Sequence, residues 1–164
     1  MSEGIGARVL RKEDKRFITG KGRYTDDIIE ANQAYAAFVR SPHAHARIVS
    51  LDTSAALAME GVETVLTGPE LVADGIGNII CGWGITSKDG TPMNMGAWSA
   101  LATEKVRYVG DAVAIVVADS KSQAKLAAEA VVVTYEELPV VVGAVAALAP
   151  GAPQIHDNAP GNLI

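Results

Sequence analysis

Three histidines are the side chains in this sequence best suited to bind a metal or to transfer a proton, and they stand at positions 43, 45 and 156. His43 and His45 are two residues apart, so on an extended chain both rings would share one face. A zinc site needs three or four ligands at recognisable spacing, and neither His156 nor the single cysteine, Cys81, provides one. We therefore interpret His43 and His45 as a surface pair without a metal.

The other familiar catalytic patterns are missing. No G-x-S-x-G turn is present, so a Ser/His/Asp triad would have to lack that turn, and there is no G-x-x-x-x-G-K-[ST] phosphate loop. Gly20-x-Gly22 and Gly75-x-Gly77 neither follow a strand nor open a helix with a third glycine, as dinucleotide binding requires. In the adjacent pairs Asp26-Asp27 and Glu136-Glu137, neighbours on extended chain point to opposite faces. The sequence therefore predicts no catalytic, cofactor-binding or metal-binding residue in this chain.

Composition indicates one globular domain with a core of small side chains. The 164 residues are 49% hydrophobic, 20% charged and only 5% aromatic, and a chain of this length buries roughly 70% of its unfolded surface. A net charge of −5 argues against a nucleic-acid or anionic-membrane partner. Early basic residues alternate with acidic ones, so we expect a solvated or subunit-facing segment there. These residues are Arg8, Arg11, Lys12, Lys15, Arg16, Lys21 and Arg23.

Two further absences bear on location. No apolar run approaches the roughly 20 residues of a membrane-spanning helix, and the N-terminal residues lack the hydrophobic region of a secretory signal. A lone cysteine excludes an internal disulfide and suits a reducing compartment. We therefore expect a cytoplasmic protein in which Cys81 is a small core or loop residue.

The elements that must position these side chains fall into three regions. Residues 1–33 form an irregular arm, residues 34–142 an ordered core, and residues 143–164 a helical turn and linker. In the core, strands are predicted over 34–40 and 47–51, with Val49 and Leu51 facing inward. A short helix then runs to Met59, followed by a strand over 62–66. Thr67 and Glu70 have the spacing of a capping box, which predicts a second short helix.

The strongest pattern lies further along the chain. Residues 112–118 form a continuous apolar run of buried-strand length, and we expect Ile115 to be buried in it. Ser120 and Gln123 have capping spacing, and a helix follows with one apolar face, formed by Ala124, Ala127, Ala128 and Val131. A strand over 131–137 completes a strand–helix–strand unit, which predicts parallel strands joined by a right-handed crossover. The predicted class is α+β, with a mixed sheet, βαβ units and small helices packed on it.

Residues 75–99 are the exception to this order. Their glycines prevent a helix, and apart from a short strand at 78–81 we expect a long loop. Loops of this length in compact domains are usually functional or bound by a partner. This one holds Trp83 and Trp98 with Ile79, Ile80, Met93 and Met95, so we predict a docking loop. The alternative is that both tryptophans fill the domain's own core.

Turns in the core have structural explanations. Gly20 and Gly22 are predicted to adopt positive φ where the arm turns. Ser41-Pro42 ends a strand so that the following segment can step to a neighbouring layer, and Gly110-Asp111 starts the strand at 112.

Four stretches, in this order, carry the pattern of a known family: R-x-E-D-x-R-F-I-T-G-x-G-x-Y-x-D-D over 11–27, A-F-V-R-S-P-H-A-H-A-x-I over 37–48, V-R-Y-V-G-D-x-V-A over 106–114, and A-x-x-A-A-E-x-V-x-V-x-Y-E-x-L-P over 124–139. With them the chain resembles the α/β hammerhead domain that begins the large subunit of molybdenum hydroxylases. This family includes xanthine dehydrogenase, aldehyde oxidase and aerobic carbon monoxide dehydrogenase, and the similarity is greatest to the last.

The resemblance implies an enzyme that oxidises CO or hydroxylates a carbon centre. It implies a molybdenum–pterin centre in its cytosine dinucleotide form, two [2Fe–2S] clusters on a small subunit and FAD on a medium subunit. In this family the pterin ligands and the catalytic glutamate follow the present domain, so no such residue is carried over. The chain is thus expected to be a structural and subunit-docking domain, inactive alone, whose linker 143–164 leads to a molybdopterin-binding domain absent here.

A second hypothesis belongs to another class of protein. The chain could be a free-standing regulatory or small-ligand-binding module, with residues 75–99 wrapped around the ligand. This hypothesis requires the four ordered stretches to be a coincidence.

Overall fold

A computed structural model describes residues 4–7 and 9–164, which form two compact units, one up to Gln33 and one over Ala34–Ile164. The first unit contains α1 (Asp14–Ile18) and a 3-10 turn, η1 (Thr25–Asp27). Arg8 lies outside the described residues, and the other early basic residues are exposed, as expected. The acidic pair serves local structure here, because Asp27 accepts a hydrogen bond from the backbone N–H of Tyr24 at 2.9 Å.

Gly20 and Gly22 of the first unit are needed for different reasons. Gly20 has φ +69°, the left-handed conformation predicted for it. The same prediction is wrong for Gly22, whose φ is not positive. A Cβ at Gly22 would instead lie 2.4 Å from Cδ1 of Phe17, whose ring stacks on Tyr24 with centroids 5.3 Å apart. The absence of a side chain at Gly22 therefore makes room for this aromatic pair.

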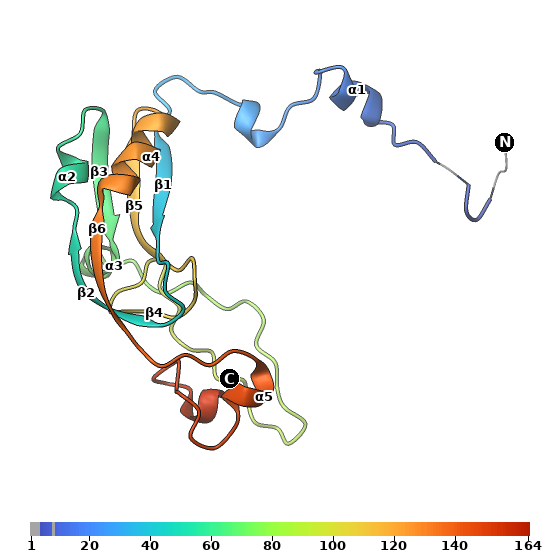
Figure 1. The fold of residues 1–164 in the computed structure, drawn as a ribbon. Coiled ribbons are helices and arrows are strands. Elements are labelled where there is room, and N and C mark those ends of the chain that lie inside the picture. The colour runs from blue at the N-terminus through green and yellow to red at the C-terminus, as the bar shows by residue number, and fades with distance from the viewer. Residues whose placement is uncertain (1–3, 8) are drawn as a thin grey trace. The chain divides into compact units, whose positions relative to one another are not determined.

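The second unit is built from two three-stranded antiparallel sheets (Figure 1). In the first sheet, β5 (Ala112–Ala118) lies between β1 (Tyr35–Arg40) and β3 (Val62–Thr67). In the second sheet, β2 (Ala46–Asp52) lies between β4 (Lys105–Val106) and β6 (Val132–Glu137). The helix-and-strand class predicted from the sequence is confirmed.

The predicted parallel crossover is wrong. Strand β5 and helix α4 (Lys121–Ala130) form as expected, but β6 then joins the other sheet and pairs antiparallel with β2. Likewise β2 and β3, which follow each other along the chain, belong to different sheets. The apolar patterns identify a strand, a helix and a strand, but they carry no information on which sheet each strand joins. That choice depends on pairing between residues far apart in sequence.

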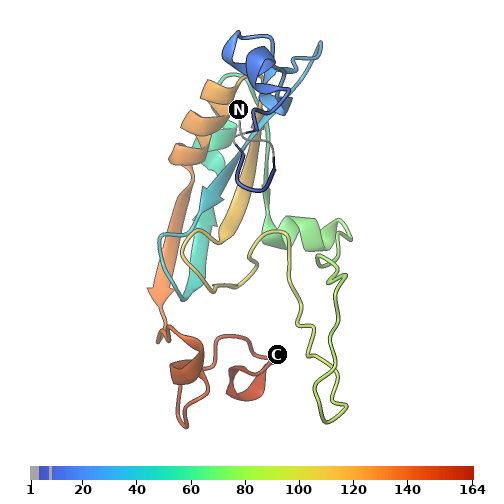
Figure 2. The same cartoon turned by 90° about the vertical axis from the view of Figure 1, so that its right-hand side faces the viewer.

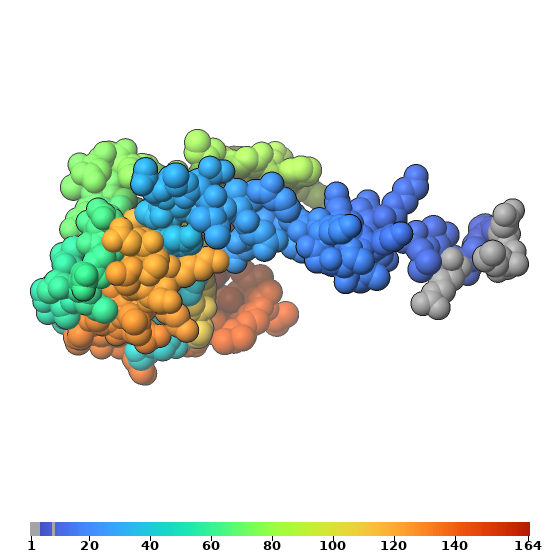
Figure 3. Space-filling view, turned by 90° about the horizontal axis from the view of Figure 1, so that it is seen from above, coloured from blue at the N-terminus to red at the C-terminus, as the bar shows by residue number. Residues whose placement is uncertain are grey.

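Helix α4 packs on one face of the first sheet and also touches α2 (Ser54–Leu57), as the view from above shows (Figure 3). Its predicted apolar face is confirmed, since Ala124 and Ala127 are buried. Ser120 caps the helix by accepting a hydrogen bond from the Gln123 N–H at 3.2 Å. On β5, Val116 is fully buried on the side of α4.

Ile115 is only partly buried, so the expectation that it lies in the core is wrong. Its neighbour Val116 faces α4, and alternation along a strand turns Ile115 to the opposite face. An irregularity in β2 overturns a second expectation. The register shifts between Ile48 and Ser50, so Ile48 and Leu51 face the core and Val49 is exposed.

Both predicted short helices form, but one differs in length. Helix α2 is shorter than predicted, stopping at Leu57, and Gly61 beyond it has φ +77°. Helix α3 (Gly68–Ala73) opens with the predicted capping box, in which Glu70 accepts hydrogen bonds from the Thr67 N–H at 2.8 Å and from its hydroxyl at 2.7 Å.

Residues 75–99 form no strand at 78–81, contrary to expectation, and contain only an isolated bridge between Thr86 and Pro92. Figures 1 and 2 show this loop and the C-terminal segment extending beyond the same end of the sheets. That segment contains α5 (Ala144–Ala147) and the 3-10 turn η2 (Pro160–Asn162). None of the helices in the described residues is long and apolar enough to span a membrane.

The burial of Val116 generates a stability prediction. We expect Val116→Asp to destabilise the chain by several kcal/mol, because it places a charge without a partner in the core, against a typical total of about 5–15 kcal/mol. Leu126→Asp is the matched control, because Leu126 is exposed on α4. Thermal unfolding followed by circular dichroism measures both variants. A Val116→Asp variant that melts within a few degrees of the parent would show that the core is misplaced.

Candidate functional site

The histidines predicted to form a surface pair lie between β1 and β2, and the structure separates their roles. His43 is partly exposed, with its ring against Tyr135 at a centroid distance of 4.9 Å and its Nδ1 3.4 Å from Oε1 of Glu137. His45 is only 6% exposed. The surface-pair interpretation is therefore wrong for His45, because the chain turns here and the two residues do not lie on one extended strand.

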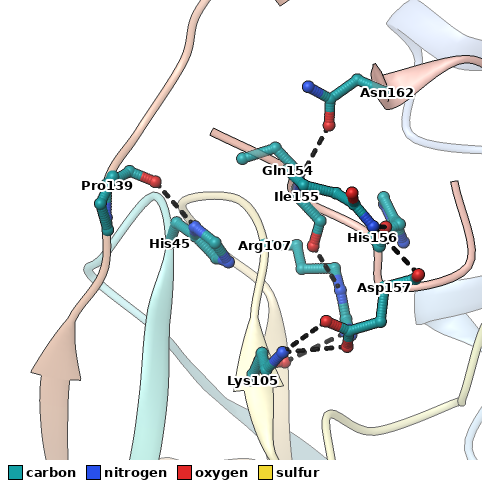
Figure 4. Close-up of polar contacts among 9 residues, drawn as sticks. All are labelled: His45, Lys105, Arg107, Pro139, Gln154, Ile155, His156, Asp157 and Asn162. Carbon is teal, nitrogen blue, oxygen red and sulfur yellow. Dashed lines mark hydrogen bonds and ion pairs between the residues drawn. The ribbon is translucent and has the colours of Figure 1, made fainter. Parts of the chain in front are cut away.

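His45 fixes the end of β6 to the start of β2. Its Nδ1 lies 2.8 Å from the carbonyl oxygen of Pro139, and its own carbonyl accepts a hydrogen bond from the Leu138 N–H at 3.0 Å (Figure 4). The contact with a carbonyl requires Nδ1 to carry a proton. Nε2 is buried and has no hydrogen-bond partner in the part of the chain that the structure describes.

A second polar junction joins the end of β1 to the turn before β5. Ser41 is buried, donates its N–H to the Asp111 carbonyl at 2.8 Å and accepts the Gly110 N–H at 2.8 Å on its own carbonyl. Gly110 has φ +92°, and its carbonyl accepts a hydrogen bond from Arg40 at 2.8 Å. The predictions for Ser41-Pro42 and for Gly110-Asp111 are both confirmed, since the chain passes from one sheet to the other at the first and β5 begins after the second.

The C-terminal segment is held against the second sheet by charged and amide side chains that the sequence analysis did not single out. Lys105 Nζ lies 2.7 and 2.9 Å from the two carboxylate oxygens of Asp157, and Arg107 Nε donates to the Ile155 carbonyl at 3.2 Å (Figure 4). Asn162 accepts the Ile155 N–H at 2.8 Å and donates to the Ala147 carbonyl at 3.0 Å. The contacts of Lys105 and Arg107 carry no signal in a single sequence, because their partners lie 52 and 48 residues away.

Two pKa shifts follow from this arrangement. The hydrogen bond from Lys105 holds the pKa of Asp157 below its ordinary value, and the charge of Lys105 adds to the effect. Burial lowers the pKa of His156, and the nearby positive charge of Arg107 lowers it further. His156 is therefore a neutral ring under ordinary conditions, packed beside Trp98 at a centroid distance of 6.3 Å.

The cavities around this segment are small or apolar. One of about 30 Å³ lies among Trp98, Arg107, Tyr108, Asp111 and His156, which is room for about one water molecule. Another of about 190 Å³ is lined mainly by apolar groups of the 75–99 loop and the C-terminal segment. Neither cavity combines the space and the polar groups that a pterin would need.

The described residues do not gather metal-ligating side chains at one place. They contain no group of three His, Cys, Asp or Glu side chains placed to hold a metal. Glu136 pairs with Arg47 at 2.9 Å, so it is occupied by a surface ion pair. Cys81 is a free, exposed thiol in the loop.

The residues that stand out are instead the exposed apolar side chains of the loop. Trp83 is 81% exposed and Trp98 is 50% exposed. Ile79, Ile80 and Met95 are exposed as well. In this structure neither tryptophan fills the core, which leaves an apolar surface of the kind that partners cover.

Comparison with known proteins places the fold. The model of the aldehyde oxidase and xanthine dehydrogenase a/b hammerhead domain matches residues 19–139. The chain therefore belongs to this family. It is the family that the four sequence stretches resemble. The chain is 42% identical over 159 residues to the carbon monoxide dehydrogenase large chain of Hydrogenophaga pseudoflava, and 40% identical over 159 residues to the nicotine 6-hydroxylase large subunit of Paenarthrobacter nicotinovorans.

Solved structures agree. A Cu,Mo-CO dehydrogenase matches with a TM-score of 0.70 and 41% identity over 92% of this chain, and quinoline 2-oxidoreductase from Pseudomonas putida 86 matches with a TM-score of 0.79 and 40% identity over 93%. The two curated relatives are matched over 96% and 97% of this chain, but the chain spans only 18% and 19% of their lengths. In the two solved structures it covers 18% and 19% of the matched chains. These relatives are oxidoreductases. A further relative is the molybdenum-binding subunit of xanthine dehydrogenase from Escherichia coli O157:H7.

The Lys105–Asp157 ion pair generates a pH-dependent prediction. Because the pKa of Asp157 is lowered in the folded chain, the contribution of this pair is present above the ordinary value of 3.8 and is lost as pH falls through the folded value. We expect Lys105→Gln to raise the pKa of Asp157 toward 3.8 and to speed amide exchange over 154–159 at pH 7, an effect that disappears once pH falls below the folded pKa of Asp157. Carboxyl titration by NMR and hydrogen exchange measure the two effects.

Lys125→Gln removes an exposed lysine of α4 and serves as the control for this change. Equal exchange rates over 154–159 in the parent and in Lys105→Gln at pH 7 would contradict the role of the ion pair.

Proposed function

We propose that this chain is the N-terminal structural and subunit-docking domain of the large subunit of a molybdenum hydroxylase, and that it is inactive by itself. The exposure of Trp83 and Trp98 on a loop of 25 residues carries the proposal. A loop that only connects α3 to β4 needs neither this length nor these side chains. Family membership supports the same conclusion, since the chain spans about a fifth of its relatives.

The complete enzyme would oxidise CO or hydroxylate a carbon centre. Its molybdenum–pterin cofactor, in the cytosine dinucleotide form, would supply the redox chemistry, and two [2Fe–2S] clusters and FAD on a small and a medium subunit would carry electrons away. We expect these groups to lie outside this chain, because its described residues contain no group of three His, Cys, Asp or Glu side chains placed to hold a metal, and neither cavity beside the C-terminal segment suits a pterin. We place the enzyme in the cytoplasm.

We expect this domain to support the structure of the enzyme and to provide docking contacts. The hydrogen bonds of Ser41 fix the end of β1 to the turn before β5, and those of His45 fix the start of β2 to the end of β6. Lys105 and Arg107 hold the C-terminal segment against the second sheet. The loop leaves from the same end of the sheets as this segment (Figure 2). We expect the loop side chains to contact the rest of the enzyme. They therefore lie together at one end of the two sheets.

The free-standing ligand-binding module is the weaker alternative. It would need the loop to close around a ligand, and the apolar cavity of about 190 Å³ beside Met95 and Trp98 is the only observation that favours it. This alternative requires the four sequence stretches to resemble the family by chance. The match of one family model across residues 19–139 argues against such a coincidence.

Tryptophan fluorescence tests the docking proposal. We expect red-shifted emission that acrylamide quenches readily in the 164-residue chain, because both indoles face water, and shielded emission in the intact large subunit. Trp83→Phe and Trp98→Phe leave one reporter each, so the two positions can be read separately. Blue-shifted, quencher-resistant emission from both residues in the isolated chain would make the loop part of the core and end the proposal.

A second measurement addresses inactivity. We expect the purified 164-residue chain to bind no molybdenum, iron or flavin and to oxidise no CO, aldehyde or purine. Elemental analysis, flavin absorbance and turnover with an artificial electron acceptor are the readouts. Stoichiometric metal, or turnover above that of a heat-unfolded sample, would contradict the absence of a site.

A further inference from the structure

The first sheet of the second unit has an apolar face that α4 does not cover. Phe38, Ile115 and Leu66 form one row across β1, β5 and β3, because each is paired in register with the next. Directly paired residues in antiparallel strands present their side chains on the same face. The neighbouring row is formed by Ala36, Val117 and Thr64. We call these six residues the outer face of the sheet.

Exposure shows that no other part of the second unit covers the outer face. Phe38 is 47% exposed, Ala36 is exposed, and the other four residues are only partly buried. Val113, two residues before Ile115 on the same strand, is by contrast fully buried against Ala102 and Val106. The segment before β4 therefore covers this side of the sheet at Val113. It does not reach the two rows of the outer face.

The sequence of β5 indicates that a cover is needed. An antiparallel sheet with one face in water normally alternates apolar and polar residues, whereas a continuous apolar run is typical of a strand buried on both faces. All seven residues of β5 are apolar, and the run A-V-A-I-V-V-A contains no polar position that would face solvent. Only the face that carries Val116 and Ala114 is buried beneath α4 and its neighbours.

The composition of the outer face selects the kind of partner. Thr64 is its only polar member, and it has no charged residue. Arg40 lies at the edge, with its guanidinium 5.2 Å from the centre of the Phe38 ring. Surfaces without charge are typical of permanent interfaces, which resemble a domain core cut in half, whereas transient interfaces are more polar. The partner must then be present whenever this domain is folded.

We propose that the outer face is a second docking surface, separate from the 75–99 loop, and that its occupant is the remainder of the same large-subunit polypeptide. This inference rests on the proposed function, because it assumes a longer chain. The relatives support that assumption, since this chain spans 18% and 19% of their lengths and more than four-fifths of such a polypeptide would lie outside it. A segment of the same polypeptide is always present at high effective concentration, as a permanent apolar interface requires.

Cysteine labelling in the full-length large subunit, expressed without other subunits, tests this assignment. Phe38→Cys places a thiol on the outer face, and Leu126→Cys places one on the exposed side of α4 as the matched control. Reaction with a maleimide is followed at each position by peptide mass spectrometry, in native and in urea-unfolded protein. We expect Cys at position 38 to react at least about 100-fold more slowly in the native subunit, the protection typical of stable local structure, and position 126 to react at nearly the unfolded rate.

Each other outcome overturns the inference. Rapid native labelling at position 38 means that nothing covers the face. Protection that appears only when other subunits are added assigns the face to another chain, and protection that increases with protein concentration assigns it to a second copy. Native Cys81, in the same peptide map, reports on the loop. Protection of Cys81 with a reactive position 38 removes this inference alone, whereas reactivity at both positions, persisting after the other subunits are added, removes the proposed function as well.

Discussion

The second unit depends on the close approach of helix α4 to the strands beneath it, which alanine permits. Ala124 and Ala127 of α4, Ala56 of α2 and Ala114 of β5 are all buried, with between 0 and 1% of their surface exposed. Side chains this small let backbones pack at the density of a protein interior without leaving a void. Only 5% of the chain is aromatic, and the few large rings are placed at junctions and on the surface. A core made in this way is closely packed and leaves little free space beneath α4.

Polar contacts hold the strand ends where the chain passes from one sheet to the other. His45 and Ser41 are the only buried polar residues in the described part of the chain, and both lie where the chain leaves the first sheet for the second. Each bonds to a segment far away in sequence, Ser41 to the turn at Gly110 and His45 to Pro139. Leaving a buried donor or acceptor unpaired costs about 1–3 kcal/mol. These hydrogen bonds therefore fix the strand ends on either side of the β1–β2 connection, whereas apolar packing among residues of both sheets forms the core.

The sequence predicts the local elements well, for physical reasons. A continuous apolar run identifies β5, the 3.6-residue period identifies the buried face of α4, and capping residues at Thr67 and Ser120 locate two helix starts. The membership of β6 in the second sheet, the burial of His45 and the inward direction of Ile48 could not be read in this way. Each depends on a partner strand or a register shift between residues distant in sequence. The absence of a catalytic site is a prediction that rests on missing motifs. The ion pair between Lys105 and Asp157 leaves no motif in the sequence.

The order of the strands has a consequence for synthesis of the chain. Tyr35 of β1 pairs with Ala118 of β5, and Arg47 of β2 pairs with Glu136 of β6, 89 residues later. A ribosome that adds about 5–20 residues per second needs several seconds or more to make the second partner after the first. During that interval β1 and β2 are unpaired strands, the kind of segment most prone to aggregate. Such non-local pairing is slow to form once the chain is complete, so this domain is expected to need protection by chaperones early in its life.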